Sequence, residues 1–125
     1  MNARARTVVV ALASLALAAC DSTELLKAQR VAGADPKAGR SVIAAVECGA
    51  CHTIPGVRGA NGIVGPPLTG FGNRQLIAGI APNTPDILSQ WVRDAPSIDP
   101  ETGMPQMPIT ADQARDVAAY LYTLR

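Results

Sequence analysis

The stretch that decides the fold is Cys48-Gly49-Ala50-Cys51-His52. Two cysteines separated by two residues and followed directly by a histidine are the attachment signature of a c-type haem. The spacing suits the chemistry, because each thiol adds to one vinyl group of the porphyrin and the adjacent imidazole then lies under the ring. We therefore predict one haem c, bound covalently through Cys48 and Cys51, with His52 as an axial ligand of the iron.

Other interpretations of this motif find no support elsewhere in the chain. A thioredoxin-like redox pair requires a βαβ context, which the sequence does not predict. A zinc site would have three ligands within five residues, and a total of three Cys and one His leaves no second Cys/His pair. A plain disulfide would explain neither His52 nor the scarcity of aromatic residues, which make up 3% of the chain. A core with so few rings must be filled by small aliphatic side chains or by a non-protein group.

Length and charge place the chain among small globular proteins. Its 125 residues suit one domain, with 48% hydrophobic residues, 17% charged residues and a formal net charge of +1. Lys and Arg are scattered singly along the sequence, so the electrostatic footprint of a nucleic-acid-binding protein is missing. We predict no nucleic-acid partner.

The N-terminus is typical of an exported protein. Arg4 and Arg6 precede an apolar stretch that is too short to span a bilayer comfortably, so we predict a signal peptide over residues 1–19. The sequence Leu-Ala-Ala-Cys at residues 17–20 resembles the lipobox of bacterial lipoproteins, which implies lipidation of Cys20. An ordinary signal peptide and an uncleaved anchor are the alternatives, and all three place the domain outside the cytoplasm. Asp21 resembles an inner-membrane retention signal, so we expect a lipid anchor on the periplasmic side of the inner membrane.

The remaining sequence predicts an all-α domain. Residues 20–34 are expected to form a membrane-proximal tether, and residues 35–125 the domain itself. We predict helices over 36–46, over 73–80, from Thr84-Pro85 onward, and over 111–123 after a capping box at Thr110 and Gln113. The middle, residues 53–108, holds eight of the eleven Gly and nine of the ten Pro, which excludes long regular elements there. Such a loop-rich centre suits a domain of three to five helices wrapped around a rigid cofactor.

Elimination reduces the number of residues that could be the second axial ligand of the iron. His52 is the only histidine in the sequence, so a haem with two histidine ligands is excluded within this chain. Outside the predicted signal the methionines are Met104 and Met107, both in a Gly/Pro-rich loop before the last predicted helix. Both could fill the core, as Met often does. A Met on a rigid loop between Gly and Pro is better suited to bind iron, and His/Met ligation is usual for this haem type.

Together these features resemble the class I c-type cytochromes, of the mitochondrial cytochrome c type, in a bacterial lipoprotein form. The resemblance covers about residues 35–125. Four stretches carry it: the helix ending in CGACH, the run GPPLTG at 65–70, the Met-Pro loop, and the closing stretch ARDVAAYLYTLR. It implies the small cytochrome c fold, in which the first and last helices cross at a Gly and an aromatic residue. Gly39 and Tyr120 fit that pair.

The resemblance also implies roles for individual residues. Pro66 matches the proline whose backbone carbonyl accepts a hydrogen bond from the ligand imidazole. The family's methionine lies six residues before the Thr that caps the last helix, which selects Met104, with Met107 as the second candidate. Trp91 matches a tryptophan that packs by the haem and bonds a propionate, although a simple core role would also explain it.

We accordingly expect an electron-transfer protein and not an enzyme. A haem with two protein ligands has no open site for a substrate but can exchange one electron. The expected partners are a terminal oxidase as acceptor and a cytochrome bc-type donor. Without residues 1–19 the chain has 9 Lys and Arg against 10 Asp and Glu, so docking should be apolar more than charge-steered. Two alternatives are a haem subunit of a periplasmic dehydrogenase or sulfur-oxidising complex, and a gas-binding haem protein with a labile Met ligand.

Overall fold

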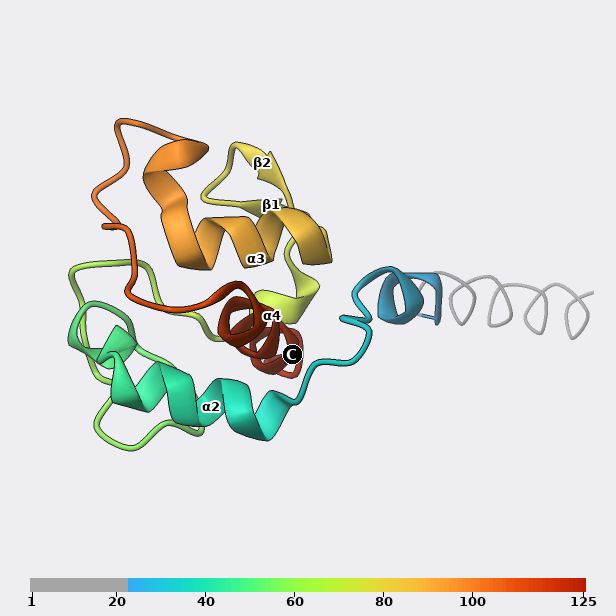
Figure 1. Ribbon diagram of the computed structural model, residues 1–125, viewed down its shortest axis with the longest axis horizontal. Coiled ribbons are helices and arrows are strands. Elements are labelled where there is room, and N and C mark those ends of the chain that lie inside the picture. The colour runs from blue at the N-terminus through green and yellow to red at the C-terminus, as the bar shows by residue number, and fades with distance from the viewer. Residues whose placement is uncertain (1–22) are drawn as a thin grey trace, which may run out of the picture.

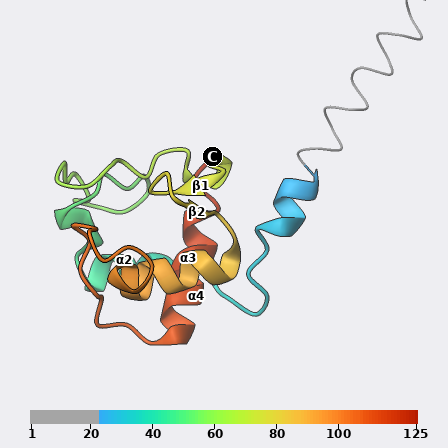
Figure 2. The same cartoon turned by 90° about the horizontal axis from the view of Figure 1, so that it is seen from above.

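A computed structural model describes residues 23–125 of the chain, so the predicted signal and Cys20 lie outside the described residues. Three α-helices form the body of the domain, and α4 packs against both α2 and α3 (Figure 1). Between α2 and α3 the chain runs through long loops, seen from above in Figure 2. The elements are α2 (Pro36–Ala45), η1 (Cys48–Ala50), η2 (Phe71–Asn73), β1 (Leu76–Ile77), β2 (Ala81–Pro82), α3 (Pro85–Asp94), η3 (Ala95–Ser97) and α4 (Ala111–Leu121).

The helix starts follow their capping residues. The carboxylate of Asp35 accepts a 2.8 Å hydrogen bond from the Lys37 amide, and Pro36 occupies the first turn of α2, where its missing N–H costs nothing. At α4 the Thr110 side chain accepts from the Gln113 amide while the Gln113 side chain accepts from the Thr110 amide. This reciprocal capping box confirms the predicted helix start.

One predicted helix is wrong. Residues 73–80 form the end of η2 and then a short hairpin in which β1 pairs antiparallel with β2. Ala78 and Gly79 both have positive φ angles, 50° and 78°, which a helix cannot accommodate but a tight hairpin turn requires. Asn83 completes the turn, because its side-chain amide donates to the Arg74 carbonyl at 2.9 Å. The local sequence suits a helix, but these long-range bonds decide the conformation.

The crossing of α2 and α4 depends on Gly39. A Cβ atom at this position would lie 1.9 Å from the carbonyl oxygen of Asp116 and 2.8 Å from the amide nitrogen of Val117, so the two helix backbones are in direct contact. Tyr120, the other residue of the expected pair, is buried, and its hydroxyl donates a 2.6 Å hydrogen bond to the Pro55 carbonyl. The aromatic residue therefore joins α4 to the loop after the Cys-X-X-Cys-His motif.

Part of the predicted tether contacts the domain. Residues 23–28 are helical, and Gln29 is 5% exposed, with its side-chain oxygen accepting a 2.6 Å bond from Arg125. Arg115 donates to the carbonyl of Ala32. This segment leaves the domain at the end opposite to the turn after α2 (Figures 1 and 2). In the described part of the chain, no helix has the length and apolar character needed to cross a membrane.

Candidate functional site

The Cys-X-X-Cys-His motif begins where α2 ends. Glu47 adopts a left-handed conformation with φ 58°, which turns the chain out of α2 and into the 3₁₀ turn η1. The amide of His52 donates to the carbonyl of Cys48 at 3.0 Å. In a 3₁₀ turn, side chains three residues apart eclipse, so the two cysteines project to the same side. This arrangement suits two covalent bonds to one flat ring.

The two thiols differ in their surroundings. Cys48 is partly buried and packs against the core, whereas Cys51 is exposed. Burial raises the pKa of the Cys48 thiol, and the neighbouring Cys51 raises it further, while a backbone hydrogen bond opposes the shift. Both cysteines are free of disulfide bonds and so are available for covalent attachment.

The imidazole of His52 is oriented by the loop that follows it. Its Nδ1 lies 2.7 Å from the carbonyl oxygen of Pro66, to which it donates as Nδ1–H. With the proton on Nδ1, the other ring nitrogen Nε2 keeps its lone pair free to bind a metal. This bond is the one that the resemblance implies for Pro66, and such a partner fixes the ring and strengthens it as a ligand.

Gly65 gives the imidazole its space. A Cβ atom there would lie 2.4 Å from Cε1 and 2.7 Å from Nδ1 of His52, so any side chain would collide with the ring. Gly65 is not among the residues predicted from the sequence, although its position directly before Pro66 is the signal that could have found it. The close fit of glycine and imidazole matches a site in which the ring has one fixed orientation.

The loop over residues 61–68 is fastened to the motif by its backbone. Gly62 donates to the carbonyl of Gly49 at 2.9 Å, and Gly65 donates to the carbonyl of Cys51 at 2.8 Å. The hydroxyl of Thr53 donates to the carbonyl of Gly62 at 3.0 Å. The attachment motif and the loop that orients His52 therefore form one rigid unit.

Further along the chain, Arg74 fastens the loop after Pro66. Its guanidinium donates to the carbonyls of Pro67 and Thr69 and lies 5.3 Å from the centre of the Phe71 ring. These bonds hold the proline run in place although Pro has no N–H to donate. This role could not be predicted from the sequence, because nothing local to Arg74 indicates which carbonyls it reaches.

The two candidate methionines lie on the segment between η3 and α4. Both views place this segment on the same side of the domain as residues 46–52 (Figures 1 and 2). Met104 is half-buried and packs against the core, and its amide lies 3.3 Å from the hydroxyl of Thr102. Met107 is also half-buried, and its amide donates to the carbonyl of Arg93 at 2.9 Å, which ties this end of the segment to α3.

Trp91 lies on α3 and is 7% exposed, within the same buried cluster as Leu88 and Val92. All four aromatic residues of the sequence are buried, the others being Phe71, Tyr120 and Tyr122. The helix predicted from Thr84-Pro85 onward is thus present as α3. The position of Trp91 in the core agrees with either of its two expected roles.

These observations fit the expected cofactor, and the comparison with known sequences decides the family. Residues 36–125 match the family described as Cytochrome c. The chain belongs to the cytochrome c family. It carries haem c covalently attached through Cys48 and Cys51, and its chemistry is haem-based electron transfer. The resemblance seen in the sequence is thereby confirmed for the domain.

A curated relative extends the comparison. This cytochrome c is 34% identical over 88 residues to the cytochrome c oxidase subunit 2 of Alkalihalophilus pseudofirmus. The aligned region covers 70% of the present chain and 25% of the relative. The chain therefore spans about a quarter of the length of that subunit.

Proposed function

We propose that this cytochrome c is a one-electron carrier whose single haem iron is bound by His52 and Met104. The observation that carries the proposal is the 2.7 Å hydrogen bond between His52 Nδ1 and the Pro66 carbonyl. It leaves Nε2 as the only imidazole nitrogen able to bind iron, and it keeps the ring from rotating. A ligand held in this way suits electron transfer, in which the coordination must change little between the two oxidation states.

Met104 is proposed as the second axial ligand. Met104 packs against the core, as Cys48 of the motif also does, whereas the backbone of Met107 is bound to α3 through Arg93. When both axial positions are taken by side chains, the haem supplies one-electron chemistry with no open coordination site, and the thioether raises its reduction potential. Trp91, buried on α3, is proposed to pack beside the haem and to bond a propionate.

We further propose that the protein works at the periplasmic face of the inner membrane, anchored by a lipid on Cys20 after removal of residues 1–19. The expected donor is a cytochrome bc-type complex, and the expected acceptor is a terminal oxidase. The relative supports this acceptor, because a quarter of its length is similar to this chain and it is named as an oxidase subunit. A Cys20→Ser variant should be recovered in the soluble fraction, and recovery in the membrane would contradict lipid anchoring.

The ligand proposal is tested by absorption spectra of the haem-loaded protein in the oxidised state, the reduced state, and the reduced state under CO. The wild type should be low-spin, show the weak far-red band of a Met–Fe(III) bond, and not bind CO. Met104→Ala should lose that band, bind CO, and have a reduction potential lower by on the order of 100 mV.

Met107→Ala is the matched control and should behave as the wild type. If Met107→Ala loses the far-red band while Met104→Ala keeps it, the ligand assignment is reversed. If the wild type is high-spin or binds CO promptly, the carrier proposal is wrong and a gas-binding haem is favoured.

A further inference from the structure

Two adjacent aliphatic side chains project from the loop that orients His52. Ile63 is 91% exposed and Val64 is 83% exposed, the highest values among the large hydrophobic residues of the described chain. Large aliphatic side chains that extend almost fully into water gain nothing from the fold itself. Apolar side chains that are exposed next to one another are a feature of interaction surfaces, and these two are adjacent on one loop.

The exposure is not a consequence of a loose loop. Hydrogen bonds from Gly62 to the Gly49 carbonyl and from Gly65 to the Cys51 carbonyl bracket the pair on both sides. A Cβ atom at Gly62 would lie 2.5 Å from the carbonyl oxygen of Ala50, so the loop backbone is in direct contact with the attachment motif. Ile63 and Val64 are therefore presented rigidly, next to the residues that carry the cofactor.

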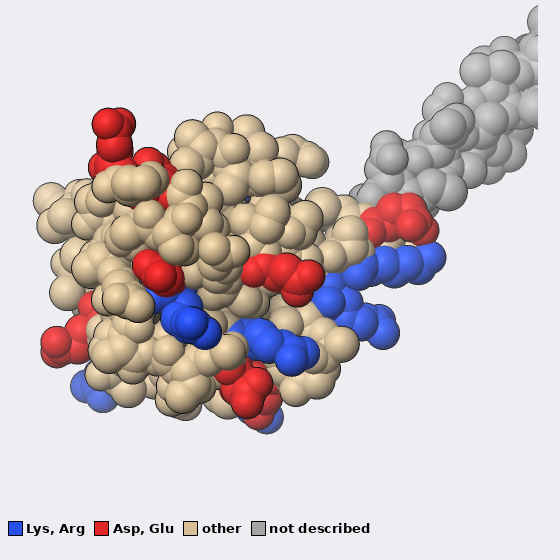
Figure 3. Space-filling view, turned by 45° about the horizontal axis from the view of Figure 1, so that its top comes forward, with Lys and Arg blue, Asp and Glu red and all other residues tan. Residues whose placement is uncertain are grey.

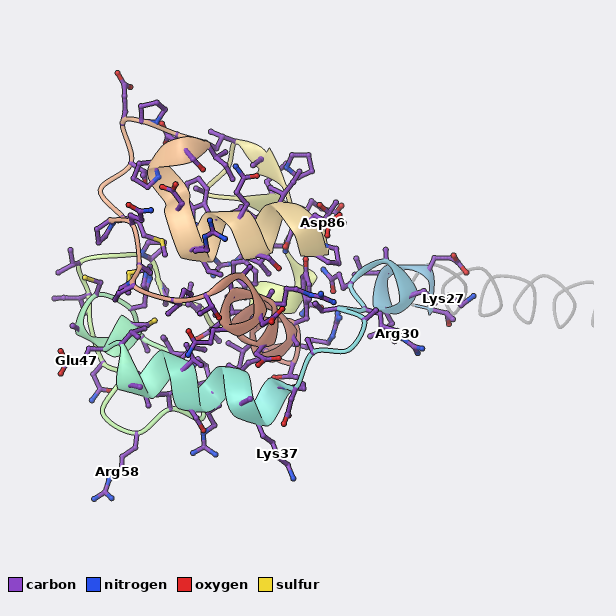
Figure 4. All side chains as sticks on the ribbon, viewed as in Figure 1. Lys27, Arg30, Lys37, Glu47, Arg58 and Asp86 are labelled. Carbon is purple, nitrogen blue, oxygen red and sulfur yellow. The ribbon has the colours of Figure 1, made fainter. Side chains whose placement is uncertain are left out.

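The surroundings of the pair carry little charge. Within residues 47–74 the charged side chains are Glu47, Arg58 and Arg74. Figure 4 shows Arg58 extending away from the domain into solvent, and the Arg74 guanidinium donates to the carbonyls of Pro67 and Thr69. Both lysines outside the signal, Lys27 and Lys37, lie well apart from Glu47, which marks the end of the domain where the motif begins (Figure 4). Figure 3 shows both acidic and basic side chains on one face of the molecule. The charges of Glu47, Arg58 and Arg74 are of mixed sign and are spread along the segment, so they form no cluster of one sign that would steer a charged partner.

On the basis of the proposed carrier function, we propose that Ile63 and Val64 form the docking contact of this cytochrome, and that the redox partner presents an apolar, uncharged surface to them. Electron transfer requires the partner's redox centre to come close to the haem, and these side chains are rigidly linked to the motif that holds it. In the docked pair one electron passes from the reduced cytochrome to an oxidised one-electron centre of the partner. No covalent bond forms or breaks in that step.

The size of the contact favours a transient redox partner over a second copy of this chain. A stable interface buries about 800 Å² per partner, whereas weak electron-transfer encounters lie at the low end of the range. Two aliphatic side chains supply only a small part of that area. A contact of this size permits fast release after the electron has moved, which a carrier needs.

The test uses a surface of known chemistry as the partner. The haem-loaded wild type, I63K, V64K and I80K are compared by voltammetry on gold coated with a methyl-terminated alkanethiol. Ile80 is the matched control, since it is a 56% exposed isoleucine in the β1–β2 hairpin, with no hydrogen bond to the attachment motif. We expect the electron-exchange rate of I63K and V64K to be at least ten-fold lower than that of the wild type, and that of I80K to be unchanged.

The wild-type rate should also vary less than two-fold between about 0.01 and 0.15 M ionic strength. A rate that depended on charge steering would change more over this range, because added salt screens charges. Equal rates for wild type and I63K, or a wild type that exchanges electrons only on a carboxylate-terminated coating, would overturn the docking proposal. In both cases the one-electron wave of the wild type remains, so the carrier function stands. The absence of any one-electron wave would overturn both the docking proposal and the carrier function. A stable wild-type dimer in sedimentation that is monomeric in I63K would show that the occupant of this surface is a second copy of the chain, and would overturn the redox-partner assignment.

Discussion

Replacing Gly65 by Ala should displace the whole imidazole of His52. The added Cβ would lie 2.4 Å from Cε1 of the imidazole and 3.0 Å from Nε2, the nitrogen proposed to bind iron, whereas ordinary contacts begin at 3.4 Å. The ring or the loop must therefore move by about 1 Å to relieve the overlap. The 2.7 Å bond from His52 to the Pro66 carbonyl would lengthen by a similar amount and leave the hydrogen-bond range.

The expected consequence is a higher reduction potential. The Nδ1–H bond to a carbonyl makes the imidazole a stronger electron donor, which favours Fe(III). A single hydrogen bond contributes about 1 kcal/mol, and a one-electron couple moves 59 mV for each ten-fold change in its equilibrium constant. Loss of the bond should therefore raise the potential by up to about 40 mV. Overpacking should also lower the free energy of unfolding by about 1–3 kcal/mol.

The assay is a redox titration of the haem-loaded protein followed by absorbance, with denaturant unfolding recorded in parallel. Gly103→Ala is the control, because a Cβ at Gly103 meets no described atom within 4 Å and its φ is not positive. The control should keep the wild-type potential. A Gly65→Ala protein with full haem content, a wild-type spectrum and an unchanged potential would show that the Pro66 bond does not tune the iron, and would refute the reasoning.

Two further predictions concern stability. In Gly39→Ala, the new Cβ would lie 1.9 Å from the Asp116 carbonyl oxygen, so α2 and α4 must separate. We expect the free energy of unfolding to fall by about 2 kcal/mol and the Tm, measured by calorimetry, to fall by roughly 10 °C. The reduction potential should be unchanged. A shift in reduction potential as large as that of Gly65→Ala would contradict the view that Gly39 serves helix packing while Gly65 serves the orientation of His52. The Tyr122 hydroxyl is buried without a hydrogen-bond partner among the described residues. Tyr122→Phe should therefore raise the free energy of unfolding by about 1 kcal/mol, measured in denaturant at pH 7. Burial, and secondarily the charge of Asp86, raises the pKa of Tyr122, so the stability that its neutral form contributes is present below pH ~10 and falls as the pH rises above that value. The Phe variant should therefore lose less stability than the wild type above pH ~10, and equal losses would count against the assignment.

The local signals in the sequence explain most of the helices. Asp35 with Pro36, and Thr110 with Gln113, are short-range capping pairs whose effect does not depend on the rest of the fold, and both helices begin where these residues predict. The prediction over 73–80 failed because its outcome depends on a distant residue, Asn83, which bonds back to Arg74. A pattern of apolar positions cannot reveal such a bond.

In the site, too, local features could be predicted from the sequence and long-range contacts could not. The spacing of Cys48, Cys51 and His52 is itself the chemistry of attachment, so the cofactor could be predicted from five consecutive residues. The role of the Pro66 carbonyl could be predicted only from the family resemblance, because Pro66 is 14 residues away from His52, whose imidazole donates the hydrogen bond. The tight fit of Gly65 against the ring could not be predicted, since a glycine in a sequence does not show what its missing side chain would meet.

The sequence by itself determined the cofactor and the main helix boundaries, because each depends on residues within a few positions of one another. Only the tertiary structure decided how His52 is oriented, why Gly39 and Gly65 must lack side chains, and which aliphatic residues remain in water. Ile63 and Val64 have the composition of core residues, and their exposure follows from the bonds that fasten their loop to the attachment motif. The burial of a side chain is set by long-range packing, which no local pattern encodes.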